Sequence, residues 1–349
     1  MRPPSLAISD DASVQEGQLG QAARDAVRHT NAVGFDLDEP SGAAMAFESM
    51  ADVAAAIPLP AGGRSLARLS GLAAVADVDL ALGRFIEAHT DALAILAELD
   101  GPTARPRERW GVWAAEGPQA TVQAQAVDGR WLLSGIKPWC SGAGICTHAL
   151  VTAPGPDGPA LWAVAIESAT VRARAGNWRS VGLSGTATEP VEFLDAPASL
   201  VGAPGGYLTR PGFWHGAIGV AAVWWGGAAG IAAPLYEAAS AGLTNPHAEA
   251  HLGAVEVMLE STAALLRQAA VGMDKDPGDV GERAALTVRG AVEAAATEII
   301  ARVGRALGPG PLCHDRAHAR RVADLSVYLR QTHAERDLAR LAALAAGRR

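Results

Sequence analysis

Cysteine is scarce in this chain, and the few cysteines exclude two kinds of site. The 349 residues contain three, Cys140, Cys146 and Cys313, and an odd number does not suit a disulfide framework. Without a second cysteine pair, their spacing matches no zinc-binding pattern, so no metal is expected. We expect a protein of a reducing compartment, the cytoplasm, in which Cys140 is a buried and inert thiol.

A membrane span and a secretory leader are also missing from the pattern. We expect no run that approaches the roughly 18 apolar residues needed to cross a bilayer. The opening MRPPSLAISDDASVQEG has no apolar core before a cleavage site. The net charge is −8, and acidic residues offset the basic clusters near the C-terminus. Neither a membrane nor a nucleic acid is therefore an expected partner.

The material that is present falls into three zones. Hydrophobic residues make up 49% and charged residues 19% of the chain, as in folded proteins of one to a few domains. Residues 1–108 and 207–349 carry apolar residues at helical spacing, whereas residues 109–206 consist of short β-rich runs separated by Gly, Pro and Asp. The pattern predicts an α+β fold, with an N-terminal helical domain, a central antiparallel β domain of about six to eight strands and a C-terminal four-helix-bundle domain.

Helical periodicity is clearest in two segments. Residues 77–99 place leucines, Phe85 and Ile86 at helical steps, and Gly101 with Pro102 ends the segment. Residues 285–303 carry an apolar residue at every third or fourth position, which is typical of one face of a bundle helix.

The stretch SGIKPWCSGAG, from Ser134 to Gly144, is unusual for a strand. Pro cannot donate to a β-ladder and Gly has no side chain to pack, yet the preceding WLL follows a tight DGR turn and begins a strand. A flat ligand beside the strand, or a close approach of another part of the backbone, would explain this composition. We expect Lys137, within the stretch, to be solvated.

Three stretches resemble signatures of the acyl-CoA dehydrogenase family of flavoproteins. DGRWLLSGIKPWCSGAG resembles the family's hairpin ending in Gly-x-Lys-x-Trp, WRSVGLSGTATEPVEFLDAPASLVGAPGGYL resembles its second signature, and ALGPGPL resembles its Gly-containing turn between the last two helices. The order and spacing of the three make the set more specific than any one of them. The resemblance covers residues 75–340 and implies a shortened N-terminal domain.

The resemblance implies bound FAD and the contacts that hold it. Trp139 would stack on one face of the planar isoalloxazine ring, and the Ser141 hydroxyl, two residues along an extended strand, would bond near flavin N5. Main-chain groups of Val112 and Trp113 would bond the pyrimidine edge of the ring. The sequence departs from the family at Trp113, where a hydroxyl residue is common.

An oligomer is a second implication of the resemblance. Gly308 and Gly310 match a turn whose backbone amides touch the cofactor pyrophosphate of a neighbouring subunit, so a homodimer or homotetramer is expected. Apart from the family pattern, the same two glycines would simply end a helix, and a lone tryptophan in a strand is more often a core residue.

The sequence departs from the family most sharply at the catalytic base. The family uses a carboxylate to remove a proton, but an alignment on Asp324 places Gln331 or Thr332 at that position, and neither is a base near neutral pH. The alternative family location, within GVAAVWWGG, contains no carboxylate either. His333 and His215 are therefore the candidate catalytic residues.

Each of these histidines also has a purely structural interpretation. His333 lies in a charged helical segment and would then be a surface residue, and His215 would be packed at the start of a helix. His89 and Asp91, two apart in EAHTDAL, do not share a helix face. Either alone could line a pocket, but we expect them at a helix surface.

Three functions are compatible with these patterns. The first is an FAD-dependent oxidoreductase of the acyl-CoA dehydrogenase type that acts on an acyl thioester or another small acyl-like molecule, with an electron-transfer partner. The second is a flavin-dependent monooxygenase of the same fold, supplied by a flavin reductase, which needs no α-proton base. The third is a non-catalytic relative without flavin. The absorption spectrum of the purified protein would separate the third from the others.

Overall fold

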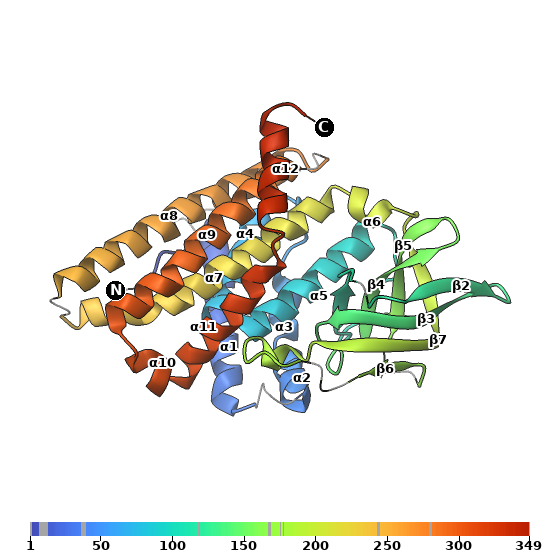
Figure 1. Cartoon of the computed structure of the whole chain (residues 1–349), viewed down its shortest axis with the longest axis horizontal. Helices are drawn as coiled ribbons and strands as arrows, with labels where there is room; N and C mark the ends of the chain where they lie inside the picture. The colour runs from blue at the N-terminus through green and yellow to red at the C-terminus, as the bar shows by residue number, and fades with distance from the viewer. Residues whose placement is uncertain are drawn as a thin grey trace.

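Helices fill most of the molecule, and one β-sheet lies at one end of them (Figure 1). The three zones follow one another along the chain as predicted, helices, sheet and helices. The computed structural model describes residues 2–6, 13–35, 40–117, 119–166, 169–174, 176, 178–242, 245–278 and 281–348.

The first zone is helical, and the helix predicted over residues 77–99 is observed as α5, which begins at Leu80 and ends at Glu98. Asp79 adopts an extended conformation, and its side chain accepts a hydrogen bond from the Leu82 amide at 2.9 Å. This N-cap ends one helix and starts the next. The described helices of this zone are α1 (Ser13–Val33), α2 (Pro40–Ser49), α3 (Ala51–Ala56), α4 (Ser65–Val78) and α5 (Leu80–Glu98).

The second zone is a seven-stranded sheet with the order β1-β4-β5-β7-β3-β2, in which β6 pairs with β7. Every pairing is antiparallel as expected except one, because β1 runs parallel to β4 with Val112 opposite Leu150. The strands are β1 (Trp110–Trp113), β2 (Gln123–Val127), β3 (Arg130–Cys140), β4 (His148–Gly155), β5 (Gly158–Ala165), β6 (Val171–Ala173) and β7 (Glu189–Val201).

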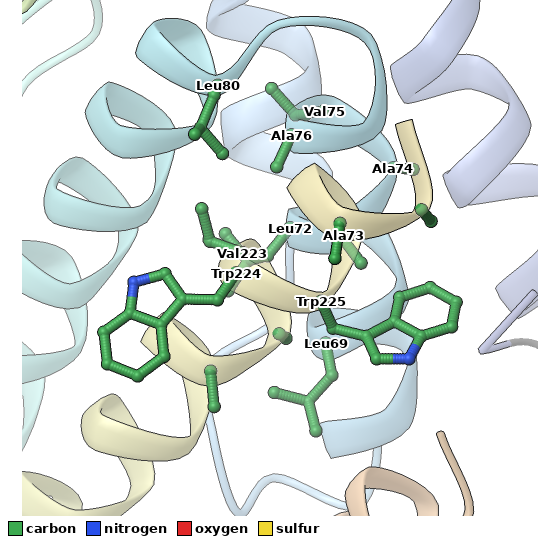
Figure 2. Packing of buried hydrophobic residues seen from close by; sticks show 14 of the residues in the cluster. Leu69, Leu72, Ala73, Ala74, Val75, Ala76, Leu80, Val223, Trp224 and Trp225 are labelled. Carbon is green, nitrogen blue, oxygen red and sulfur yellow. The ribbon is translucent and has the colours of Figure 1, made fainter. Parts of the chain in front are cut away.

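The third zone is a helical bundle built on one central helix, α7. Trp224 and Trp225 of α7 are buried between helices of the first and third zones (Figure 2), and the Trp225 indole donates to the Leu259 carbonyl at 3.1 Å. The elements are α6 (Gly206–Thr209), α7 (Gly212–Ser240), α8 (Pro246–Lys275), α9 (Glu282–Leu307), α10 (Gly310–His314), α11 (Arg316–Tyr328), the 3₁₀ turn η2 (Leu329–Gln331) and α12 (Glu335–Ala345).

A glycine lets α7 lie directly against α4. A Cβ atom on Gly226 would come within 2.1 Å of the Ala73 carbonyl oxygen, so no side chain fits at this crossing. The largest apolar core accordingly draws its buried residues from α4 and α5 as well as from α7, α8 and α9. The two helical zones of the sequence therefore share one core.

The expectation about long apolar runs is wrong for α7. Residues 216–236 contain no charged side chain, and α7 is long and apolar enough to pass a test for a membrane span. In the structure, however, 83% of its most apolar window is buried against other helices. Burial within the bundle accounts for the apolar composition of this helix.

His89 and Asp91 are not on an exposed helix face, contrary to expectation. The Nδ1 atom of His89 accepts a hydrogen bond from the Trp110 amide at 3.2 Å and so joins α5 to β1. Burial lowers the pKa of His89 to about 4, which keeps this ring neutral. Asp91 lies beside Gly216 of α7. Its Oδ1 is 3.7 Å from Nη2 of the buried Arg210, which lies just before α7.

Candidate functional site

Trp139 lies on the surface at the end of β3, and a bulge places it there. The pairing of β3 with β7 is irregular between Lys137 and Cys140, and Trp139 has a φ of +59°. Its side chain is 61% exposed. The Trp178 ring meets it edge-on, with 6.1 Å between centroids and 88° between planes. The described residues thus leave the Trp139 indole accessible to a planar ligand.

Lys137 is buried, not solvated, and the same bulge explains the error. Simple strand alternation would put Lys137 and Trp139 on one face of the sheet. The extra residue of the bulge separates them, so Lys137 is 0% exposed. Its ammonium donates to Glu116 Oε1 at 2.9 Å and to both oxygens of Thr152 at 2.8 Å, which satisfies the buried charge.

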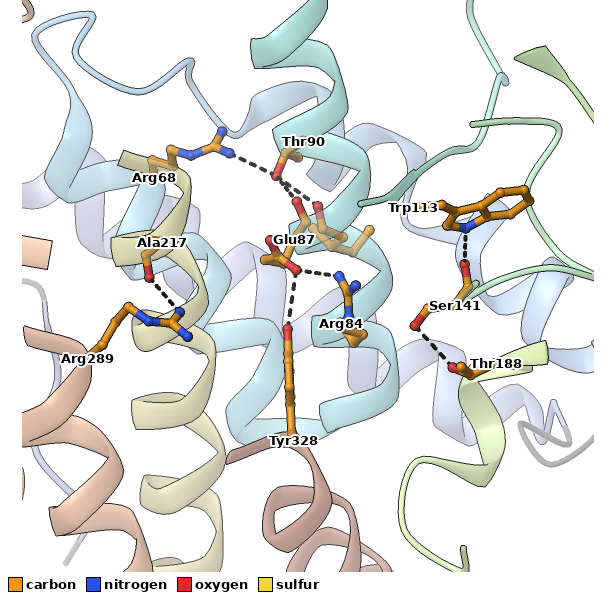
Figure 3. Close-up of polar contacts among 11 residues, drawn as sticks. Arg68, Arg84, Glu87, Thr90, Trp113, Ser141, Thr188, Ala217, Arg289 and Tyr328 are labelled. Atoms are coloured by element: carbon orange, nitrogen blue, oxygen red, sulfur yellow. Dashed lines mark hydrogen bonds and ion pairs between the residues drawn. The ribbon is translucent and has the colours of Figure 1, made fainter. Parts of the chain in front are cut away.

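Ser141 stands at the head of a short series of hydroxyl groups. Thr188 Oγ1 donates to Ser141 Oγ at 3.0 Å (Figure 3), and Thr188 contacts Thr186 Oγ1 at 2.8 Å. Thr186 in turn donates to the Leu183 carbonyl at 2.7 Å. Ser141 thus accepts one hydrogen bond, and within the described part of the chain its own hydroxyl hydrogen has no acceptor. That hydrogen is available to a ligand.

Trp113 connects β1 to the Ser141 segment through its side chain. The indole is buried, and its Nε1 donates to the Ser141 carbonyl at 2.9 Å (Figure 3). Where a hydroxyl residue is common in the resembling family, this chain therefore has a structural bridge. β1 is an edge strand of the sheet, so the main-chain groups of Val112 and Trp113 that face away from β4 lie outside the sheet ladder.

Gly142 turns the chain back toward α5. It has a φ of +74°, and its amide donates to the Thr186 carbonyl at 2.8 Å. A Cβ atom here would come within 2.6 Å of Cys146 Sγ and 3.6 Å of Phe85. The glycine is therefore required by the turn itself. Burial raises the pKa of the Cys146 thiol to about 12, and Cys140 is buried with its pKa also raised.

The loop that carries Trp178 and Thr188 is fixed to α11. The Leu183 amide donates to Asp324 Oδ1 at 2.6 Å, and Asp324 is buried. At Gly182 a Cβ atom would lie 2.2 Å from the Ala323 carbonyl oxygen, so only glycine permits this approach. Asp324, used above to align the chain with the family, thus positions the loop beside Trp139.

Neither candidate catalytic histidine is placed beside Ser141 by a described contact. His333 is exposed before α12, with Nδ1 3.5 Å from Asp337 Oδ1. His215 is buried and lines a cavity of about 750 Å³ whose described walls come from α7, α8, α9 and the segments joining α8 to α9. Trp139 and Ser141 are not among the described residues of that lining. Catalytic roles for the two histidines stay predictions.

Gly308 and Gly310 stand at the junction of α9 and α10, far along the chain from the Trp139 segment. Gly308 has a φ of +68°, and neither glycine has another described atom within 4 Å of an added Cβ. The open space around their backbone is compatible with a contact from a second copy. That contact stays a prediction.

A buried carboxylate on α5, Glu87, was missed by the sequence analysis. Arg84 Nη1 lies 2.6 Å from Glu87 Oε2, and the Tyr328 hydroxyl donates to the same oxygen at 3.2 Å (Figure 3). Burial is the largest influence on the Glu87 pKa and raises it, against the opposing effect of Arg84. Phe85, on the same helix, lies beside the Gly142 turn. Glu87 is two residues further along and therefore faces another side of α5, toward Tyr328 of α11.

Arg289 lies near this carboxylate and forms no ion pair with the residues that the structure describes. Its guanidinium lies 4.6 Å from the centroid of the Trp224 ring and donates to the carbonyl of Ala217 at 3.3 Å and of Gln331 at 3.4 Å. Gln331 is one position at which the family's base was sought, and Arg289 contacts its carbonyl. At the other position, the Thr332 hydroxyl donates to Asp337 Oδ2 at 3.4 Å. No group of three His, Cys, Asp or Glu side chains in the described part of the chain could hold a metal ion.

Comparison with known proteins now defines the architecture. No protein-family model matches the chain, and no curated protein matches it. Solved structures do: KijD3 in complex with dTDP aligns with a TM-score of 0.79 at 19% identity, over 98% of this chain and 98% of that one. TdsC from Paenibacillus sp. A11-2, solved with FMN and indole, aligns with a TM-score of 0.77 at 18% identity, over 93% and 96% of the two chains.

A third match decides the fold. The steroid ACAD Tcur3481-Tcur3483 aligns with a TM-score of 0.70 at 21% identity, over 95% of this chain and 99% of that one. The chain has the acyl-CoA dehydrogenase fold. In the terms of that fold, Trp139 and Ser141 lie at the end of β3 in the central domain, and α11 contacts the loop beside them. At these identities the likeness establishes the architecture, which agrees with the α+β prediction.

Proposed function

We propose that this chain is a flavin-dependent oxidoreductase. The observation that carries the proposal is the pairing of an accessible indole at Trp139 with the Ser141 hydroxyl, whose hydrogen has no acceptor in the described part of the chain. Proteins of the same fold support it, because the TdsC structure was solved with FMN and a further KijD3 structure also contains FMN. A bound flavin would supply the capacity to accept and donate electrons.

The chain's own residues would hold the flavin in three ways. The Trp139 indole would cover one face of the ring. The Ser141 hydroxyl, kept in place by the hydrogen bond from Thr188, would donate to a ring nitrogen. Main-chain groups of the β1 edge at Val112 and Trp113 would bond the polar edge of the ring. The resemblance in sequence favours FAD, with Gly308 and Gly310 of a second copy against its pyrophosphate.

Two reactions belong to this proposal, and one observation favours the second. Dehydrogenation of an acyl thioester needs a base, but neither Gln331 nor Thr332 is a carboxylate, and Glu87 is enclosed by Arg84 and Tyr328. Monooxygenation with reduced flavin from a partner reductase needs no such base. TdsC is itself a dibenzothiophene monooxygenase. We therefore propose that the reaction is monooxygenation of a small organic molecule, in preference to acyl-CoA-type dehydrogenation.

Flavin titration of purified wild type and variants tests the proposal. Trp139→Ala should weaken flavin binding about tenfold, the equivalent of about 1.4 kcal/mol of lost ring contact. Trp139→Phe should recover part of the affinity because it keeps an aromatic face. Val181→Ala, an exposed apolar residue on the neighbouring loop, is the control. Equal flavin affinity in wild type and Trp139→Ala would refute the assignment of the ring site.

Two assays then separate the reactions. Oxygen consumption with added reduced flavin and a panel of small aromatic or heteroatom-containing molecules would support monooxygenation. Anaerobic bleaching of the bound flavin by acyl thioesters would support dehydrogenation. A wild-type protein that is colourless and takes up neither FAD nor FMN would contradict both and would leave a non-catalytic role for the fold.

A further inference from the structure

A second cavity lies between α1, the α4–α5 junction and α11, and arginine side chains dominate its polar lining. α11 lies beside α1 in Figure 1. The cavity has a volume of about 450 Å³, within the range of pockets that hold small molecules. Its described lining residues are Asn31, Gly34, Phe35, Val78, Asp79, Leu80, Arg316, Ala317, Arg320, Arg321 and Asp324.

The hydrogen-bonding state of Arg320 points to a missing acceptor. Its only described ion pair is a long one, 3.5 Å from Nε to Asp324 Oδ2, and both Nε and Nη2 are buried without a hydrogen-bond partner. A fully satisfied arginine in the same chain looks different, because Arg340 reaches both oxygens of Glu282 at 2.7 Å. Buried donors in proteins are almost always paired with protein, water or an ion. Arg320 therefore has unused donors at the wall of this cavity.

Arg321 shows how the cavity wall is held in place. Its Nη2 donates to the Val78 carbonyl at 2.9 Å and its Nη1 to the Gly230 carbonyl at 3.2 Å, which anchors α11 to α4 and α7. Its Nε atom is buried without a partner. Two carbonyl acceptors neutralise no charge, so the guanidinium of Arg321 keeps its full positive charge at the cavity.

The acidic residues in the described lining are already engaged. Asp79 accepts the Leu82 amide as the N-cap of α5, and Asp324 accepts the Leu183 amide of the loop beside Trp139. Arg320 shares its long ion pair with Asp324, whereas the described hydrogen bonds of the Arg321 guanidinium go to carbonyl oxygens. Arg321 therefore brings a positive charge to this partly enclosed cavity, and such a charge favours an anionic ligand.

We propose that this cavity binds a phosphoryl group. A guanidinium presents a planar fork of N–H donors that matches the oxygens of phosphate, and Arg320 has two such donors to spare. The phosphate has two candidate sources. One is the flavin, because Asp324 connects this cavity to the loop that meets Trp139. The other is a separate phosphate-bearing molecule. The first source rests on the proposed function, whereas binding of inorganic phosphate does not.

Calorimetric titration with inorganic phosphate at low ionic strength tests the site itself. Arg320→Gln should weaken phosphate binding by about tenfold or more, as expected for the loss of a charge-assisted hydrogen bond. Arg320→Lys keeps the charge but loses the fork of N–H donors, so its phosphate affinity should lie between those of wild type and Arg320→Gln. It also serves as the readable variant if Arg320→Gln does not fold. Arg336→Gln, an exposed arginine on α12, removes the same charge and should leave binding unchanged.

Titration of the same variants with FMN and riboflavin identifies the source of the phosphate. If Arg320→Gln weakens FMN binding but not riboflavin binding, the phosphate belongs to the flavin. If it weakens inorganic phosphate while FMN and riboflavin bind as in wild type, or not at all, the phosphate belongs to another molecule. The proposal is overturned if wild type does not bind phosphate, or if Arg320→Gln and Arg336→Gln bind it equally. Failure of flavin binding leaves the phosphate measurement readable.

Discussion

Stability should fall as the pH is lowered through the range in which His89 would titrate in the unfolded chain. The ring accepts the Trp110 amide through Nδ1 and is packed edge-on against Phe47, so a proton on Nδ1 would remove the acceptor that joins α5 to β1. The pKa falls from an ordinary value of 6.5 to about 4 in the folded protein. The unfolded chain thus binds the proton between these values and the folded protein does not.

The magnitude follows from the linkage between protonation and unfolding. The stabilisation from neutral His89 is complete above pH 6.5 and is lost as the pH falls toward 4. With the two pKa values above, the free energy of unfolding should decrease by about 2 kcal/mol between pH 7.5 and pH 5 from this residue alone. This is a large share of the usual stability of a folded domain.

His89→Asn isolates the effect. Its side-chain oxygen can accept the Trp110 amide but does not titrate, so the variant keeps the acceptor and loses the pH dependence. Urea unfolding of both proteins at pH 7.5 and pH 5, followed by tryptophan fluorescence, gives the two differences. Other titrating groups, including His318 with its lowered pKa, contribute equally to both. Equal losses in wild type and variant would refute the assigned pKa and the role of the neutral ring.

Three further outcomes test other features. In thermal unfolding, Gly182→Ala should lower the free energy of unfolding by about 1–3 kcal/mol, because its Cβ would enter α11, and it should also weaken flavin retention. The control is Gly253→Ala on α8, where a Cβ would lie in open space. This variant should raise the free energy of unfolding by about 1 kcal/mol in the same assay. A thiol reagent should modify the exposed Cys313 quickly and the two buried cysteines only on unfolding; fast reaction of all three would contradict their burial. Glu87→Gln should lower the unfolding free energy by about 3 kcal/mol, because Arg84 stays buried without its carboxylate, and adding Arg84→Met should recover part of it.

Local pattern was enough to predict the succession of elements. The hairpin before Trp139, the short β-rich runs and the apolar faces of α5 and α9 can be predicted from residues close together in the sequence, and the structure has strands and helices there. The helix predicted over residues 77–99 is observed as α5, Leu80–Glu98. It begins slightly later than predicted because Asp79 is extended and its side chain caps the helix, which the apolar periodicity does not reveal.

The errors arise where distant segments meet or where the strand is irregular. Lys137 was expected in solvent because strand alternation does not reveal a bulge, and its partner Thr152 lies on another strand. Glu87 has a local signal in Arg84 three residues before it. However, its burial comes from α11 through Tyr328, more than two hundred residues along the chain, and no window of sequence contains that information.

The close crossing of α4 and α7 has a consequence for how this protein is made. Leu69 and Leu72 of α4 are fully buried in a core completed by Trp224 and Trp225 of α7, which the ribosome adds only after the whole β-sheet region. During that interval the nascent chain exposes apolar surface whose packing partner, α7, has not yet been synthesised. Under this condition aggregation competes with folding. Synthesis of this protein should therefore depend on chaperones until α7 has emerged.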